Sequence, residues 1–134
     1  MMLIDVAVSV ELQVRITATG RATVLTLTGE LDERTVSSFC MQTADVLATD
    51  TVELVLDLQR LYFLDVAGLV VLVELSGKLE QAGGGLALAG VRPRVREFME
   101  QSAVGRALRR FADVEQALAA VAPMAAATAV ATRN

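Results

Sequence analysis

The sequence predicts an α/β fold, with one mixed but mostly parallel sheet of four to five strands and about four helices packed mainly on one face. Three observations favour this fold class. Short segments rich in β-branched and aliphatic residues alternate with segments of helical periodicity. Helical segments of about 10 to 15 residues between strands are typical of parallel crossovers. The first two strands are close enough in the chain to pair as a hairpin, which would give the sheet an antiparallel edge.

The chain of 134 residues is long enough for one domain, and 54% of its residues are hydrophobic. A domain of this size buries roughly two thirds of the surface that its unfolded chain exposes. We expect residues 1–121 to form that single domain. Residues 122–134 are rich in alanine and have little to bury, so we expect them to form a disordered tail.

The predicted sheet begins with two strands. Apolar and polar residues alternate over 12–17, the period of a half-buried strand, with Leu12, Val14 and Ile16 on the apolar side. A turn at 19–21 leads to a second strand over 24–27. Helical spacing then predicts a helix of about a dozen residues. Its inward residues are expected to be Val36, Phe39, Cys40, Thr43 and Leu47.

The central stretch of the chain, 51–81, is the most informative. A nearly continuous apolar run over 52–58 suits a strand buried on both faces, and a loop is predicted at 59–64. Asp65 then opens a helix as its N-cap, accepting a hydrogen bond from the free backbone N–H of Ala67 or Gly68. The buried side of this helix is predicted to carry Leu69, Leu72, Leu75, Ser76 and Leu79.

The opposite side of this helix mixes apolar and polar residues, namely Ala67, Val70, Val71, Glu74, Lys78 and Gln81. Small apolar residues near the helix start would therefore face outward, beside unpaired backbone N–H groups and the positive end of the helix dipole. A packed core does not require Val70 at such a position. Two interpretations stay open: a binding surface for a partner, and a slightly apolar surface helix.

The remaining elements follow in order. A run of three glycines ends this helix and leads into another short strand. Pro93 suits the first turn of a helix near 94–101, and residues 105–110 are predicted as a connection or an edge strand. Asp113 caps a last helix over 114–121. The apolar residues expected to pack inward are Leu86, Leu88, Val91, Val95, Phe98 and Met99.

Composition excludes several kinds of chemistry. The chain has no histidine, which removes serine–histidine and cysteine–histidine nucleophile pairs and histidine metal sites. Cys40 is the only cysteine, so no internal disulfide can form and a reducing cytoplasm is expected. Because the sequence shows neither an acid–base pair with a pocket nor a Gly-rich phosphate loop, we expect no enzymatic activity, no cofactor and no metal.

Charge and hydropathy argue against two further classes. The formal net charge of −4 does not suit a general nucleic-acid binder. Residues 1–10 contain Asp5 and no basic lead, unlike a signal peptide. The uncharged stretch 116–132 is mostly alanine and is divided by Pro123, so membrane insertion is not expected.

Half of the twelve basic residues lie in one segment, 92–110, which contains only two acidic residues. The segment has a net charge of +4 and the rest of the chain has −8. Such asymmetry could steer a charged protein partner, although a solvated face is the simpler interpretation. The basic residues are Arg92, Arg94, Arg96, Arg106, Arg109 and Arg110.

Four short sequences occur in a distinctive order: G-E-L-D at 29–32, V-L-D-L at 55–58, F-L-D-V-A-G-L at 63–69 and A-G-G-G-L-A-L-A-G-V at 82–91. In this order and spacing, over residues 12–121, the chain resembles the STAS domain. That family comprises anti-sigma factor antagonists and the cytoplasmic domains of sulphate transporters. The resemblance implies the STAS fold and a non-catalytic regulator of transcription, which binds an anti-sigma factor that is also a serine-protein kinase.

The chain departs from the family pattern at one position above all. In bacterial antagonists of the family the segment equivalent to 65–71 reads D-S-S-G-L-G-V, and the partner kinase phosphorylates the second serine. Here Ala67 stands at that position, Val66 replaces the preceding serine and Val70 replaces the second glycine. Alanine has no hydroxyl, so the charge of a phosphate that would block docking cannot be added.

The resemblance therefore leaves two roles open. The chain is either an antagonist that is always competent to bind, or a STAS subunit of a signalling scaffold or of the cytosolic part of a membrane transporter. A homodimer through the sheet edge or the second helix is compatible with both. The predicted partner-binding residues are Asp32, Leu64, Asp65, Val66, Ala67, Gly68, Leu69, Val70, Val71 and Glu74.

Other polar residues near this segment have competing roles. Asp32 is a partner contact by resemblance, but it could equally cap the first helix. Thr35 is the least unsuitable substitute phosphate acceptor, although a capping hydroxyl is its simpler role. Ser37, Ser38 and Ser76 are expected to be structural.

Overall fold

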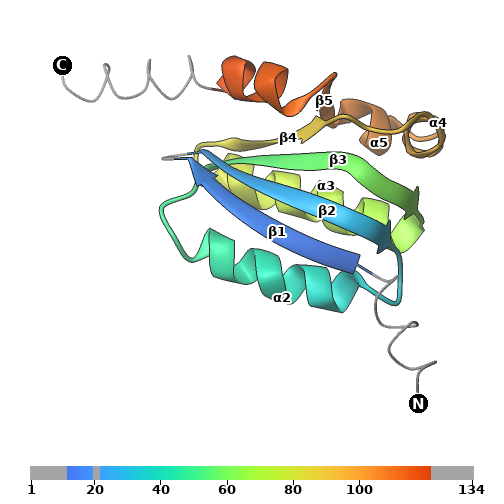
Figure 1. Ribbon diagram of the computed structural model, residues 1–134, viewed down its shortest axis with the longest axis horizontal. Coiled ribbons are helices and arrows are strands. Elements are labelled where there is room, and N and C mark those ends of the chain that lie inside the picture. The colour runs from blue at the N-terminus through green and yellow to red at the C-terminus, as the bar shows by residue number, and fades with distance from the viewer. Residues whose placement is uncertain (1–11, 20–21, 122–134) are drawn as a thin grey trace.

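Five strands form one sheet, in the order β1-β2-β3-β4-β5, in the computed structural model, which describes residues 12–19 and 22–121 (Figure 1). β1 pairs with β2 antiparallel, and the other three pairings are parallel. The predicted mixed, mostly parallel sheet is confirmed. The strands are β1 (Leu12–Thr19), β2 (Ala22–Leu31), β3 (Glu53–Leu64), β4 (Gly85–Ala89) and β5 (Arg109–Phe111).

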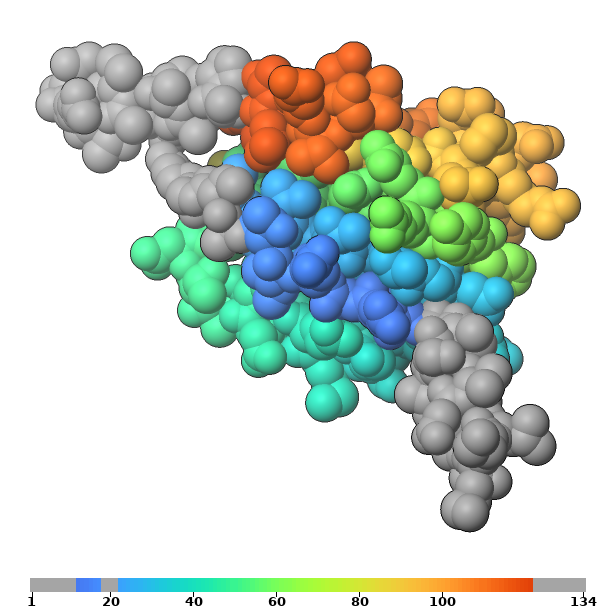
Figure 2. Space-filling model, viewed as in Figure 1, coloured from blue at the N-terminus to red at the C-terminus, as the bar shows by residue number. Residues whose placement is uncertain are grey.

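The helices lie on both faces of the sheet, most of them on one. Phe39 and Val46 of α2 and the leucines of α3 pack with leucines of β2 and β3 in the main core, which α4 and the residue after α5 complete. The helical segment 114–121, orange-red in Figure 2, packs on the opposite face. There, Ala117 and Val121 form a second core with Val24, Val55 and Ala87. The labelled helices are α2 (Val36–Leu47), α3 (Val66–Gln81), α4 (Pro93–Glu100) and α5 (Ala103–Ala107).

β3 is the central strand, and both of its faces are covered as predicted. Leu54, Leu56 and Leu58 belong to the main core, whereas Val55 belongs to the second one. The prediction of a loop at 59–64 is wrong, because β3 continues to Leu64, which pairs with the last residue of β2. Two register shifts against β2 each leave an extra residue in β3 and interrupt its alternation of buried and exposed side chains, so the sequence shows no strand period there.

Two predicted core positions are wrong. Ile16 is 54% exposed, because it faces an open hollow near the end of α2, lined by Asp45 and Thr49 among others. Cys40 is also exposed. The buried face of α2 consists of Phe39, Thr43 and Val46, and Cys40 lies just outside this face. The turn residues 20–21 and the expected tail 122–134 lie outside the described residues.

The carboxyl-terminal third contains an element that the sequence did not reveal. Residues 103–107 form the short helix α5, and only 109–111 form the expected edge strand. Val91 was expected in β4 but follows Gly90, whose φ of 68° ends that strand. Pro93 does occupy the first turn of α4, and the Asp113 carboxylate accepts from the Gln116 N–H at 2.8 Å as the predicted cap of the last helix.

Candidate functional site

β2 and β3 end side by side, since Leu31 pairs with Leu64, and the turns that follow them therefore adjoin. Asp65 joins the two turns. Its Oδ1 accepts from the Gly68 N–H at 2.9 Å, which confirms the predicted N-cap of α3. Its Oδ2 accepts from the Glu33 N–H at 3.1 Å, across the gap to the other turn. One carboxylate thus fixes both the start of α3 and its neighbour.

The turn between β2 and α2 is organised by Asp32. Its carboxylate accepts from the Arg34 backbone N–H at 2.9 Å and from the Arg34 guanidinium at 3.0 Å. The Asp32 backbone N–H donates to the Thr35 hydroxyl, which itself donates to the Glu30 carbonyl at 2.9 Å. The side chains of the turn therefore hold its conformation before any partner protein binds.

The hydrogen bonds of this turn favour the ionised form of the Asp32 carboxyl. Burial of the side chain would by itself raise the pKa of the carboxyl, because an ionised carboxylate loses hydration. The hydrogen bonds and the charge of Arg34 act in the opposite direction, and the net result is a pKa below the usual range of an aspartate. Asp32 is only 5% exposed, so the structure assigns it to the turn and leaves little of its surface for a partner.

Gly68 allows α3 to approach β2 closely. A Cβ at this position would collide with the backbone oxygen of Leu31, and it would lie 2.6 Å from Cδ1 of Leu64. Only glycine avoids both contacts without moving the helix. The start of α3 is thus pinned by the Asp65 cap and by this close approach.

The predicted partner-binding residues fall into three groups by exposure. Val66 and Val70 are 66% and 47% exposed, and Glu74 is exposed as well. Asp65, Ala67 and Val71 are half-buried. The buried members of the set are Asp32, Leu64, Gly68 and Leu69. We call the exposed and half-buried residues of α3, Val66, Ala67, Val70, Val71 and Glu74, the α3 platform.

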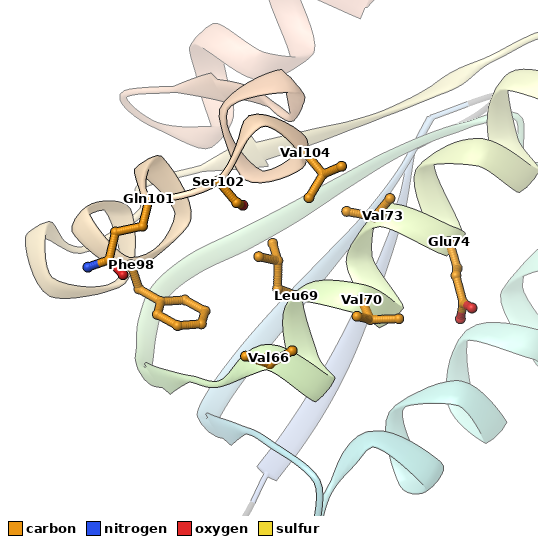
Figure 3. Close-up of a pocket in the computed structure, with 9 residues that line it drawn as sticks. All are labelled: Val66, Leu69, Val70, Val73, Glu74, Phe98, Gln101, Ser102 and Val104. Atoms are coloured by element: carbon orange, nitrogen blue, oxygen red, sulfur yellow. The ribbon is translucent and has the colours of Figure 1, made fainter.

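The α3 platform borders an apolar groove of about 490 Å³ (Figure 3). α3 supplies one wall with Val66, Leu69, Val70 and Val73, and Glu74 is the only charged residue of the lining. The opposite wall comes from α4, from α5 and from the residues between them. It consists of Phe98, Gln101, Ser102 and Val104.

The second wall of the groove was missed by sequence reasoning, except that Phe98 was expected to pack inward. Ser102 is the N-cap of α5 and accepts from the Gly105 N–H at 3.2 Å. A serine three residues before a glycine is a weak signal of this cap, and five helical residues are too few to show a period. Val104, 53% exposed, therefore had no predicted role.

None of the serines and threonines considered above replaces the missing serine at the start of α3 within the described residues. Ala67 presents a methyl group there. Thr35 is buried, and its hydroxyl is occupied within the turn rather than as a side-chain cap of α2, so that expected role is wrong. Ser37 and Ser38 are exposed on α2, and Ser76 is half-buried on α3.

The arginines of the segment 92–110 do not form one patch. Arg92 stacks over the Tyr62 ring at 4.7 Å and donates to the Gln59 carbonyl. Arg109 lies 3.8 Å from the Glu53 carboxylate, on another side of the sheet. Arg106 donates to the carbonyl of Glu100 at 3.0 Å.

Residues 12–19 and 22–121 contain neither a candidate metal site nor a candidate membrane-spanning helix. No group of three or more acidic, cysteine or histidine side chains is placed to hold a metal ion in this part of the chain. Nor does a helix among these residues have both the length and the apolar character needed to cross a membrane.

Comparison with known proteins gives consistent matches. A sequence model of the STAS domain matches residues 13–117. The chain is similar to an anti-sigma factor antagonist from Mycobacterium paratuberculosis, at 22% identity with a TM-score of 0.74, over 83% of this chain and 94% of the other. It is also similar to the phosphorylated form of the Bacillus cell fate determinant SpoIIAA, at 23% identity with a TM-score of 0.62, over 82% and 98%.

A third similar structure is much longer. The murine anion transporter Slc26a9 matches at 14% identity with a TM-score of 0.73, over 91% of this chain but only 24% of the transporter. At these identities the structural matches show a common fold.

Proposed function

The chain belongs to the STAS domain family, and from that premise we propose that it is a non-catalytic protein-binding regulator of the anti-sigma factor antagonist kind. It presents the α3 platform to an anti-sigma factor of the serine-kinase class and thereby releases a sigma factor for transcription. The observation that carries this proposal is the exposure of Val66 and Val70 at the start of a helix that is otherwise pinned in place. It acts in the cytoplasm, without a cofactor.

The physical basis of docking is apolar. Covering Val66 and Val70 would remove two large exposed side chains from water and contribute on the order of 1 kcal/mol each. The groove beside them offers a concave surface for a side chain of the partner. Because the Asp65 cap and the Asp32 turn are already formed, little ordering is needed on binding.

Regulation differs from that of the phosphorylated members of the family. Phosphate at the position of Ala67 would add about −1.5 to −2 charges beside the platform and oppose docking. Ala67 cannot accept that group, so the protein stays competent to bind at all times. Its activity is then set by its concentration or by the partner.

The test mixes the purified protein with a candidate anti-sigma kinase and radiolabelled ATP, and measures binding by calorimetry. We expect a complex with no phosphate on the wild-type chain. Val66→Asp should weaken binding at least tenfold, about 1.4 kcal/mol. Ile16→Asp should not, because Ile16 is a similarly exposed β-branched residue on β1, away from the α3 platform. Ala67→Ser should gain a phosphate.

Two outcomes would contradict the proposal. One is a phosphate on the wild-type chain near the start of α3. The other is an equal loss of binding in Val66→Asp and Ile16→Asp, because this would place the contact elsewhere.

A second function is favoured by one observation. The similarity to Slc26a9 covers 91% of this chain, so the same fold also occurs within a membrane transporter. The alternative is therefore a STAS subunit of a transporter or signalling scaffold, which would co-sediment with membranes or with a large complex. Recovery of the native protein from cells as a small complex with a kinase would favour the first function instead.

A further inference from the structure

A second hollow, of about 440 Å³, lies at the carboxyl ends of β4 and β5. We call it the β4–β5 cavity. Its lining consists of Gly90, Val91, Arg96, Arg110, Phe111 and Ala112. At 100° per residue, Arg96 points away from the side of α4 that carries Phe98 and faces the apolar groove. The two hollows are therefore separate.

The backbone around the β4–β5 cavity is fixed. The Gly90 N–H donates to the Phe111 carbonyl at 3.0 Å, which ties the end of β4 to the end of β5. The φ of 68° at Gly90 turns the chain away from the sheet immediately afterwards. The cavity thus lies outside the carboxyl ends of two adjacent parallel strands whose ends are held together.

The charge around the cavity is positive and incompletely neutralised. Nη1 of Arg110 is buried and has no hydrogen-bond partner among the described residues. Its nearest acidic group is the Glu100 carboxylate at 3.5 Å, a loose ion pair whose acidic member is half exposed to water. Arg96 adds a second, exposed guanidinium. A buried donor without an acceptor is costly, and a guanidinium fork matches the oxygens of phosphate.

We propose that the β4–β5 cavity binds a small molecule that carries a phosphate group on a flat apolar body. The two guanidiniums would hold the phosphate. Val91 and Phe111 would contact the apolar body, because the cavity is much larger than one phosphate and falls in the range of small-molecule sites, about 300–1,000 Å³. Glu100 would disfavour binding by its charge, so the ligand must displace or outcompete this carboxylate at Arg110.

The experiment titrates phenyl phosphate into the full chain and follows backbone amide shifts by NMR. We expect shifts centred on Gly90, Phe111 and Ala112, and an affinity higher than that for inorganic phosphate. Arg96→Gln and Arg110→Gln should each lower the affinity about tenfold, since each removes a charge-assisted hydrogen bond. Arg94→Gln is the matched control, because Arg94 is an exposed arginine of the same helix that does not line the cavity.

Three results would overturn the proposal. They are an absence of shifts at the cavity, an equal loss of affinity in Arg94→Gln, and an affinity for phenyl phosphate no higher than for inorganic phosphate. Benzoate in place of phenyl phosphate reports whether a carboxylate suffices. Arg96 is exposed, so Arg96→Gln should fold normally even if Arg110→Gln does not. The test does not involve the α3 platform, so its outcome is independent of the proposed function.

Discussion

The substitution Gly68→Ala probes how closely α3 must approach β2. The new Cβ would meet the backbone oxygen of Leu31 and lie 2.6 Å from Cδ1 of Leu64. A backbone oxygen cannot rotate away, so the start of the helix has to move. Overpacking of this kind destabilises by about 1–3 kcal/mol, which outweighs the gain of up to about 1 kcal/mol that alanine brings within a helix.

Gly77→Ala supplies the control within the same helix. A Cβ at Gly77 has nothing within 4 Å, so only the helical preference of alanine acts there. We expect Gly77→Ala to stabilise the protein by about 0.5–1 kcal/mol and Gly68→Ala to destabilise it. Urea unfolding followed by circular dichroism measures both free energies of unfolding. If both variants changed the free energy of unfolding equally, the close approach at Gly68 would not contribute to stability, and the reasoning would be refuted.

The remaining predictions concern the two aspartates of the site. Asp65→Ala removes the cap of α3 and the hydrogen bond to Glu33, and should lower the free energy of unfolding by about 1–2 kcal/mol. Asp65→Asn keeps a side-chain oxygen that can accept, so it should lose less stability. Equal losses in the two variants would contradict a capping role. The pKa of Asp32 is lowered in the folded state, so its stabilising effect is present above the unfolded pKa of about 3.9 and disappears as the pH falls through the folded pKa. Unfolding of Asp32→Asn should accordingly vary less with pH in the acid range than unfolding of the wild type.

Local sequence signals were sufficient to predict where α3 begins. The carboxylate of Asp65 and the N–H group of Gly68 are three residues apart, so the cap could be predicted without knowing the fold. The exposed position of Val70 followed from helical spacing alone, whereas Val66 was included only through the family resemblance. Family resemblance then led to the proposal that this end of the helix binds the partner.

Features made by distant parts of the chain could not be predicted in this way. The extension of β3 depends on pairing with β2 through two register shifts, and shifts of this kind erase the alternation that marks a strand. The groove beside the α3 platform requires α5 to place Val104 across from α3, which no periodicity in the sequence indicates. The exposure of Ile16 likewise depends on where α2 ends, not on the sequence around it.

The central place of β3 has a consequence for the way the chain folds. The β1–β2 hairpin closes over a few residues, and such hairpins form in about 1–10 μs. The pairings of β3 with β2 and with β4 each join residues about thirty positions apart. The chain entropy lost in closing the two loops is therefore nearly equal. Because neither crossover is shorter than the other, we expect the pairing of β3, which joins both, to be the slow step of folding.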